Sequence, residues 1–372
     1  MAITTISVND ALAVRSWSKK LAAEVSKATA IAPLIGVGSN HILQLKDETQ
    51  KSAGDNVSFG LRAQLIGEGV SEGMNLEGRE EALTTLSDQV RINELAHAVR
   101  VKNEGTIDQQ RALFNLRVEA KDGLVDWYSD RLSLMFFTHM CGYTSKTMNF
   151  EGQDIILKPV HYGFNEPTAP SKERHIIAGN KTSEEDLTPD DAFNLSLIDK
   201  AVERAKLANP KIRPVRVEGE SVYVLYLHPT QVTALRTNTN AGQWLDITKA
   251  AYSGSRSKNP IFDGSLGMYN GVVLREAEHI TVGVGIKFPY NSLRHTRRAV
   301  LLGAQAGVVA FGRDSGPTRY RLVEELFDYE RELGVAAKTL IGMKKTVFKS
   351  TKSSLAAQDF ATIVISTYAA PL

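Results

Sequence analysis

Residues 106–140 read TIDQQRALFNLRVEAKDGLVDWYSDRLSLMFFTHM and determine the architecture. The stretch contains no proline, and its large apolar residues recur at helical spacing: Phe114, Val118, Val125, Tyr128, Leu132 and Phe136. At a rise of 1.5 Å per residue, one helix of this length would extend roughly 50 Å, well beyond the usual three or four turns. The sequence therefore predicts a single long helix that serves as a spine for other elements.

Two alternating segments before this stretch predict a protruding β arm. Residues 57–65 and 90–101 each place apolar side chains on one face, and a bulge near Asn93 and Glu94 would explain a shift of parity in the second segment. Between them lies GEGVSEGMNLEGREEAL, residues 67–83, which has too few apolar residues to pack against a core. We expect an exposed loop at the tip of two strands that are marginally stable alone and are held by a neighbouring subunit.

The remaining segments mix helices and strands without a strict βαβ repeat. Helices are predicted at residues 9–30, 189–208 and from Thr230 onward. VYVLYL, residues 222–227, is apolar on both faces, as buried strands are. Further apolar or β-rich segments follow at 271–276, 301–312 and 360–369. The fold class is therefore α+β.

Composition excludes several classes of protein. The 372 residues include 44 Lys and Arg against 42 Asp and Glu, so a net charge of +2 predicts no general attraction to nucleic acid, and any DNA contact must be local. The single cysteine, Cys141, cannot form an intramolecular disulfide. The first residues, MAITTISVNDALAVRSW, do not resemble a signal peptide, and no apolar run reaches the ~18 residues of a membrane span. We expect a folded protein of the cytosol that is not embedded in a membrane.

Motifs for cofactors and metals are incomplete. The glycine clusters at 36–38, 67–73 and 283–285 do not complete a dinucleotide or P-loop fingerprint. The sequence has no H-E-x-x-H, no paired C-x-x-C and no EF-hand loop. We therefore expect no catalytic site, no cofactor and no metal.

Four side chains remain as candidates for chemistry. His139 and Cys141 are interpreted as a residue at the end of a helix and a core cysteine, because neighbours two apart on a helix do not face each other. His97 falls on the apolar parity of its strand and is interpreted as a core histidine. His228 ends a buried strand, where a catalytic residue could lie, but no nucleophile or carboxylate partner is evident. A cytosolic hydrolase centred on His228 is the alternative from another functional class.

Opposite charges lie far apart in the chain. Basic residues gather in two late stretches: Lys338, Lys344, Lys345, Lys349 and Lys352, and Arg294, His295, Arg297 and Arg298. Complementary patches suit docking between copies, where charge sets register. Inter-subunit contacts are therefore predicted at Glu68, Glu72, Glu77, Arg79, Glu80, Glu81, Lys344 and Lys345. The simpler alternative is that each patch is an ordinary solvated surface.

Seven ordered blocks carry a resemblance to a known family. They are GDNVSFGLRAQLIGEGV with LEGREEAL, QQRALFNLRVEAKDGLVDWYSDR, LHPTQVTALRTNT with GQWLDI, NPIFDGSLGMYNGVVLRE, LLGAQAGVVAFG, GMKKTVF and ISTYAAPL. Over nearly the whole chain, the sequence resembles the major capsid proteins of large-genome, short-tailed phages that package a virion RNA polymerase, and of their relatives. Where such proteins commonly have Gly-Asn-Glu-Glu, this chain has Arg79 at the second position.

The resemblance implies the Johnson fold of tailed-phage capsids and a division of the chain. The implied parts are an N-terminal arm (1–50), an extended loop (51–103), a peripheral domain (104–184) with a spine helix (106–140), an axial domain (185–312) and a return to the peripheral domain (313–372). The segment from Ser145 to Leu187 is less familiar and is interpreted as a variable insertion.

The resemblance also implies a function and partners. Copies are expected to form pentamers and hexamers of an icosahedral shell around double-stranded DNA, in the virion, after assembly in the bacterial cytoplasm. Portal, scaffolding and decoration proteins are possible partners, and packaged DNA would be touched without sequence preference. A cellular compartment shell of the same fold is the structural alternative.

Overall fold

The computed structural model describes most of the chain: residues 21–25, 31–46, 55–62, 67–80, 85–103, 105–145, 147–150, 153–156, 165–217, 219–238, 265–283, 295–312, 319–348 and 357–369. Of the helix predicted over residues 9–30, only 21–25 fall in this set, and they are helical. Within these ranges, no helix is both long and apolar enough to cross a membrane.

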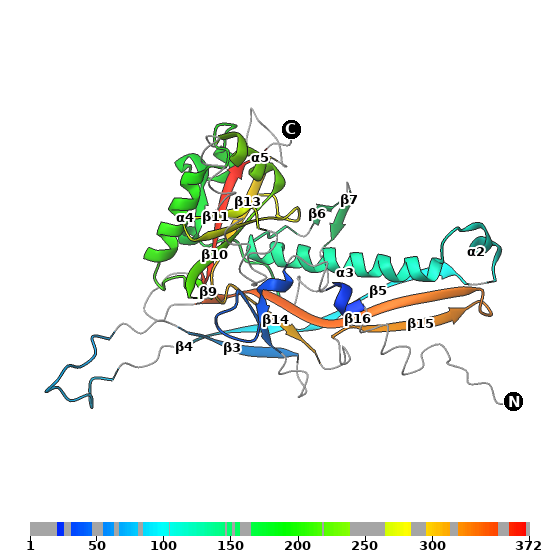
Figure 1. Ribbon diagram of the computed structural model, residues 1–372, viewed down its shortest axis with the longest axis horizontal. Helices are drawn as coiled ribbons and strands as arrows, with labels where there is room; N and C mark the ends of the chain where they lie inside the picture. Colours follow the sequence, from blue (N-terminus) through cyan, green and yellow to red (C-terminus); the bar gives the residue numbers. More distant parts are fainter. Residues whose placement is uncertain are drawn as a thin grey trace.

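A six-stranded sheet lies along the spine (Figure 1). Its strands are β1 Ile35–Gly36, β2 Leu43–Lys46, β5 Asn93–Lys102, β14 Gly307–Phe311, β15 Arg321–Phe327 and β16 Glu332–Lys345. The long strand β16 is its centre, because β5, β14 and β15 all pair with it in antiparallel register. Segments from the start, the middle and the end of the chain are thereby joined in one sheet.

The spine is helix α3, Leu116–Met140, which packs on β5 and β16. The hydroxyl of Tyr128 is 2.9 Å from the carbonyl oxygen of Leu95 on β5 and 2.7 Å from that of Ala337 on β16. The buried hydroxyl has one hydrogen to donate, and either carbonyl can accept it, so burial leaves this donor satisfied.

The prediction of one helix over residues 106–140 is wrong at its start. A separate short helix, α2, covers Ile107–Arg111, and Ala112 is extended with φ −79° and ψ 132°. Asn115 then begins α3, since its side chain accepts a hydrogen bond of 2.9 Å from the Arg117 N–H. Gln109 stabilises the break by donating to the Phe114 carbonyl and accepting from the Leu116 N–H. Local polar capping therefore overrides the apolar periodicity.

The predicted two-stranded arm is confirmed, but its second strand lies mostly before the predicted segment, because residues 85–91 pair with the first strand and most of 90–101 belongs to another sheet. Strand β3, Asn56–Arg62, pairs with β4, Thr85–Arg91, and the described loop residues 67–80 extend away from the body at the lower left of Figure 1. At Ile92 the chain leaves β3 and continues as β5 beside β16. The parity shift therefore marks a change of partner between two sheets, where a bulge was predicted.

A seven-stranded sheet forms the second body, at the upper left of Figure 1. Its order is β11, β12, β10, β13, β19 and β8, with β9 also paired to β10. The bounds are β8 His175–Ile177, β9 Val215–Val217, β10 Glu220–Leu227, β11 Gly267–Tyr269, β12 Val272–Glu276, β13 Thr296–Leu302 and β19 Thr362–Tyr368. The segment predicted as a buried strand is β10, and it lies between β12 and β13 in the sheet.

Two helices accompany this sheet, α4 Leu195–Leu207 and α5 Pro229–Asn238. The prediction began α4 near residue 189, which is too early because Asn194 is its N-cap and accepts from the Leu197 N–H at 3.2 Å. Two pairings of short strands complete the described strands: β6 Thr147–Phe150 with β7 Gln153–Ile156, and β17 Val347–Phe348 with β18 Gln358–Asp359.

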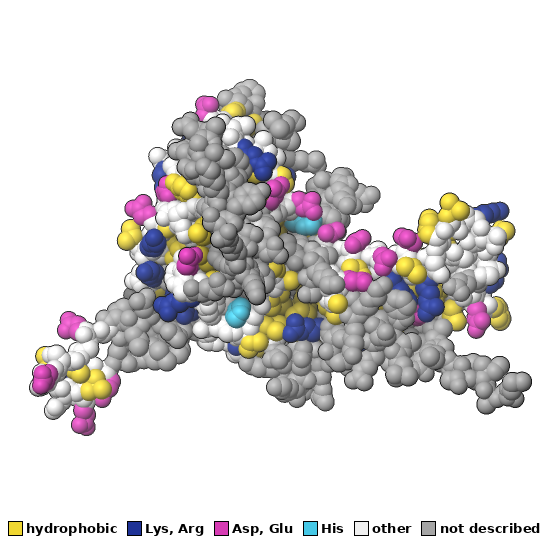
Figure 2. Space-filling view, in the orientation of Figure 1, with side chains coloured by type: hydrophobic (Ala, Val, Ile, Leu, Met, Phe, Trp, Pro, Cys, Tyr) yellow, Lys and Arg dark blue, Asp and Glu magenta, His cyan; other side chains and the backbone are white. Residues whose placement is uncertain are grey.

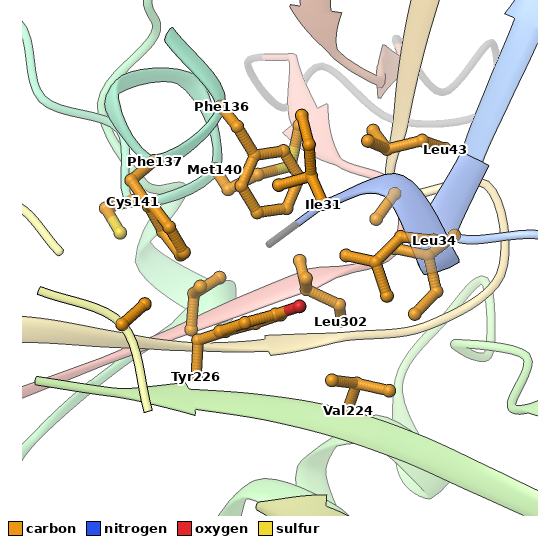
Figure 3. Packing of buried hydrophobic residues seen from close by; sticks show 14 of the residues in the cluster. Ile31, Leu34, Leu43, Phe136, Phe137, Met140, Cys141, Val224, Tyr226 and Leu302 are labelled. Carbon is orange, nitrogen blue, oxygen red and sulfur yellow. The ribbon is translucent and has the colours of Figure 1, made fainter. Parts of the chain in front are cut away.

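One core joins the two bodies where the spine ends (Figure 3). Phe136, Phe137 and Met140 from the last turns of α3 lie close to Tyr226 of β10, and all four are essentially unexposed. The ring centroids of Phe137 and Tyr226 are 5.3 Å apart in an edge arrangement. The C-terminal end of the spine is thus fixed between both sheets.

Candidate assembly surfaces

The tip of the arm is a solvent-exposed acidic loop. All described residues from 67 to 80 are exposed, including Glu68, Glu72, Glu77 and Glu80, and Figure 2 shows their carboxylates gathered at the end of the protrusion. Local hydrogen bonds shape the loop, such as the 2.7 Å bond from the Gly78 N–H to Glu80 Oε2. Glu81 lies outside the described residues. The loop has no core of its own, so any firm structure must come from contact with another molecule.

Apolar side chains accompany these charges. Val70, Met74 and Leu76 are 36%, 48% and 60% exposed, and Arg79 Nη1 is 3.6 Å from the Met74 sulfur. Mixed apolar and charged side chains on a projecting loop are typical of protein–protein contact surfaces.

The basic residues predicted to meet this loop are engaged inside the subunit. Lys345 is 1% exposed, and its Nζ is 2.8 Å from Asp359 Oδ1 and 3.1 Å from the Thr168 carbonyl oxygen. Lys344 is half-buried, with its Nζ 2.6 Å from Asp88 Oδ1. The prediction of an inter-subunit contact is therefore wrong for Lys345, because a buried ion pair cannot reach another subunit, and Lys344 already has an acidic partner.

The other predicted basic group also turns inward. Arg298 is buried, and Arg297 donates to the Ile280 carbonyl oxygen at 3.0 Å. Lys338 is exposed on β16. Arg294, Lys349 and Lys352 lie outside the described residues.

An apolar surface that the sequence did not reveal lies at the N-terminal end of the spine. We name it the distal apolar cluster: Ile107, Leu113, Phe114 and Val118, which are 62%, 103%, 55% and 43% exposed. Figure 2 shows apolar side chains at this end of the molecule. Phe114 and Val118 belong to the apolar stripe at helical spacing that predicted the spine. The extended conformation of Ala112 and the cap at Asn115 separate the first apolar residues of the stripe from the main helix.

A strained turn lies at the same end. Asp328, Tyr329 and Glu330 all have positive φ, at 51°, 51° and 69°, and Tyr329 is 99% exposed. Asn103 holds the turn by donating from its side chain to the Glu330 carbonyl oxygen at 2.9 Å, directly before α2. The strain presents an aromatic side chain to solvent beside the distal apolar cluster.

The opposite end of the spine carries a buried charge network. Arg298 of β13 donates to both Glu184 oxygens, at 2.7 and 2.8 Å, and to the Gly142 carbonyl oxygen just after α3, at 2.8 Å. Ser366 Oγ lies 2.5 Å from Glu184 Oε1. We call Arg298 and Glu184 the spine clamp, because they tie the C-terminal end of α3 to the seven-stranded sheet.

The network keeps Glu184 ionised. Burial alone would raise the pKa of this carboxyl, but hydrogen bonds from His175, Arg298 and Ser366 together with the charge of Arg298 lower it well below its usual range. A cation at the C-terminal carbonyls of a helix is also favourable for the helix dipole. The clamp is therefore a paired charge that supports the fold.

The interpretation of Cys141 as a core residue is confirmed, and that of His97 is wrong. The Cys141 thiol is fully buried and donates to the Arg298 carbonyl oxygen at 3.2 Å, and burial raises its pKa to about 11. His139 is also buried, at the end of α3. His97 is exposed and stacks on the indole of Trp127 from α3, with ring centroids 4.3 Å apart.

His228 caps a helix. Its Nδ1 accepts from the Thr230 N–H at 3.2 Å, as an N-cap side chain does at the second helical position. The Gln231 side chain accepts from the His228 N–H at 3.0 Å, which is the reciprocal contact of a capping box at the start of α5. Burial, assisted by the charge of Arg297, lowers the pKa of His228 to about 3. A general base works best with a pKa near the operating pH, so these contacts favour the structural interpretation of His228. Among the described residues, no group of three His, Cys, Asp or Glu is placed to hold a metal ion.

Solved structures define the class of protein. The chain is similar to the capsid of Ralstonia phage GP4, at 31% identity and a TM-score of 0.79, over 100% of this chain and 99% of that one. The cyanophage Pam1 capsid shares the fold, at 19% identity and a TM-score of 0.64, over 93% of this chain and 94% of that one. The predicted α+β Johnson fold of tailed-phage capsid proteins is confirmed.

Sequence comparison gives the family. The family model described as phage capsid protein matches residues 5–371. The major capsid protein of Pseudomonas phage KPP25 is 24% identical over 360 residues, covering 93% of both chains. The chain belongs to the phage capsid protein family, and it is a structural subunit of the virion.

Proposed function

We propose that copies of this chain assemble as pentamers and hexamers into an icosahedral shell that encloses the double-stranded DNA of a tailed phage. The observation that carries the proposal is the projecting arm, whose loop is exposed at every described position from 67 to 80. A shell multiplies modest contacts, so each interface needs only moderate affinity.

The acidic loop docks on an adjacent subunit in this proposal. Glu68, Glu72, Glu77, Arg79, Glu80 and Glu81 set the register through charge, and the apolar side chains of the loop supply buried area. Lys345 is removed from the predicted contact set, because it is paired inside the subunit. Lys344 stays in the set because 23% of its side-chain surface is exposed.

The experiment is to replace residues 67–81 by a short Gly-Ser linker and compare purified particles by negative-stain electron microscopy and sedimentation velocity. We expect a folded subunit with the thermal unfolding midpoint of the wild type and no closed shells. Val37→Ser, which changes an exposed apolar side chain outside both proposed contacts, serves as the control and should assemble normally. Normal shells from the chain without the loop would overturn loop docking.

The distal apolar cluster is proposed as a second contact between copies. Exposed contiguous apolar surface on a soluble subunit marks an interaction site, and in a family that assembles from one chain the partner is another copy. The cluster lies at the end of the molecule opposite the acidic loop, along the long axis of Figure 1. Contacts at both ends would let each subunit join neighbours on two sides.

The finer assignments are also proposals. We propose the division into an N-terminal arm (1–50), peripheral segments (104–184 and 313–372) and an axial domain (185–312), with the extended loop (51–103) shortened to end at Arg91, since β5 pairs with β16. Assembly in the host cytoplasm and contacts with portal, scaffolding or decoration proteins belong to the same proposal. Membership of the large-genome, short-tailed phages rests on the seven sequence blocks, and a virion RNA polymerase gene in the same genome tests it.

We further propose that the chain carries out no catalysis. The capping box around His228 supports this, because it gives the residue a structural task. A substrate screen that found turnover lost on His228→Ala would favour the hydrolase alternative. A gene neighbourhood without terminase and portal would favour the compartment shell.

A further inference from the structure

An open groove of about 1020 Å³ lies in the seven-stranded body between α4 and residues 172–182. Five cationic side chains line it, and we call it the basic groove: Lys172, Arg174, Lys181, Lys200 and Arg204. Two acids, Glu173 and Glu203, line it as well. Cations therefore outnumber acids on a chain whose total charge is almost balanced.

These cations are not neutralised inside the subunit. Lys200 Nζ donates to the amide oxygen of Asn180 at 3.0 Å, and Arg204 Nη1 donates to the His175 carbonyl oxygen at 2.7 Å, so both partners are uncharged. None of the five cations forms an ion pair with any acid in the described ranges. The groove keeps its positive potential.

Arg174 is the second, independent observation. It is 2% exposed, and only its Nη2 has a partner, the Pro210 carbonyl oxygen at 2.9 Å. Its Nε and Nη1 have no hydrogen-bond acceptor among the described residues. The nearby Asp359 is occupied by Lys345. Glu173 and Asp359 act on Arg174 through their charges, but neither forms an ion pair with it among the described residues. A buried guanidinium whose N–H groups lack acceptors is costly, so this side chain is suited to a negatively charged group brought from outside.

We propose that the basic groove binds phosphate groups of nucleic acid. Lys200 and Arg204 are one helical turn apart on α4, and Lys172 and Lys181 lie on the other wall, so positive charge follows both sides of an open channel. That arrangement fits a chain of phosphates better than one small anion, which an enclosed pocket would hold. Backbone contacts of this kind are independent of base sequence. The inference extends the proposed function, in which the shell encloses DNA, by giving the nucleic acid a defined site.

The test measures binding of a short labelled DNA duplex to the full-length subunit by fluorescence anisotropy at several salt concentrations. Lys200→Ala with Arg204→Ala should weaken binding roughly tenfold and lower the slope of log affinity against log salt by about 1.8, as expected for two lost phosphate contacts. Lys206→Ala with Lys211→Ala removes the same charge from exposed positions that do not line the groove. Equal losses in both double variants would overturn the proposal.

Further measurements identify the source of the anion. Arg174→Met should bind DNA more weakly and yet unfold at the same or a higher temperature, because it removes a buried guanidinium with two unsatisfied N–H groups. Stabilisation of the wild type by inorganic phosphate with no DNA binding would overturn the nucleic-acid assignment. Binding of a peptide of residues 67–81 that depends on Lys200 and Arg204, without DNA binding, would overturn it in favour of a second copy.

The same variants separate this proposal from shell assembly. Lys200→Ala with Arg204→Ala should still form closed shells in electron micrographs if assembly depends on the arm and the distal apolar cluster. If the variant forms shells and binds DNA as the wild type does, the proposal that the basic groove binds DNA is overturned and the proposed function is not. Absence of shells from the wild-type chain would count against the proposed function instead.

Discussion

From Leu132 to Cys141 every residue at the C-terminal end of the spine is buried, whereas at its N-terminal end Leu113 and Phe114 stand in solvent. The buried end combines an aromatic core with the spine clamp. The exposed end combines apolar side chains with a strained turn. One helix thus joins a region whose interactions are complete within the subunit to a region whose interactions are not, and the two should respond differently to mutation.

The largest effect on folding is expected at the spine clamp. Arg298→Leu leaves Glu184 buried without its partner, and breaking a buried pair in this way costs roughly 3–5 kcal/mol in the free energy of unfolding. Chemical denaturation of the unassembled subunit measures it. Adding Glu184→Leu should recover much of the loss. Arg321→Leu, at an exposed position on β15, is the control and should change stability little. An Arg298→Leu subunit as stable as this control would contradict the role of the clamp.

The clamp also predicts how stability depends on pH. Because the folded-state pKa of Glu184 lies below its unfolded value, its ionisation stabilises the fold above about pH 4.3, and this stabilisation is lost as the pH falls through the folded pKa. Glu324 acts in the same direction. Burial would raise its pKa, but hydrogen bonds from Arg117 and Lys121 lower it. Glu184→Gln should be less stable at neutral pH and lose less stability on acidification. Parallel denaturation curves for both proteins across this range would disprove the linkage.

A smaller effect is expected where the spine begins. Asn115→Ala removes the side-chain acceptor for the Arg117 N–H and should cost about 1 kcal/mol. Asp122→Ala, at an exposed position inside the same helix, is the matched control and should stay within about 0.5 kcal/mol of the wild type. Denaturant midpoints compare the two, and no difference between them would mean that the cap does not fix the start of α3.

The smallest effect on folding should come from the distal apolar cluster. Leu113→Ser with Phe114→Ser alters exposed side chains, so the free energy of unfolding should move by no more than about 0.5 kcal/mol. Closed shells should nevertheless be lost or greatly reduced, as measured by sedimentation velocity. Val37→Ser, which changes an apolar side chain 71% exposed elsewhere on the subunit, should assemble normally. Normal shells from the double variant would show that the distal apolar cluster is not a contact needed for assembly.

The same contrast explains what could be predicted from the sequence. The spine, the arm and the strand at 222–227 have strong local patterns, and local patterns are set by helix and strand periodicity. The break at Ala112 was missed because capping by Asn115 overrides an apolar stripe. The change of strand partner at Ile92 resembles a bulge in sequence, because both shift the parity by one residue.

The assembly surfaces were predictable only in part. The acidic loop was evident because its composition cannot form a core. Lys345 was misassigned, because the acid that neutralises it, Asp359, comes close only in the folded chain. The distal apolar cluster was missed because periodicity shows which residues share a helix face but not whether anything covers that face.

The most direct test of the account is hydrogen–deuterium exchange on unassembled subunits and on closed shells of the same protein. We predict that assembly slows exchange strongly in residues 67–80 and 105–118, while residues 132–142 are equally protected in both states. Equal exchange of the loop and of the distal end before and after assembly, or a gain of protection confined to the buried end of the spine, would contradict it.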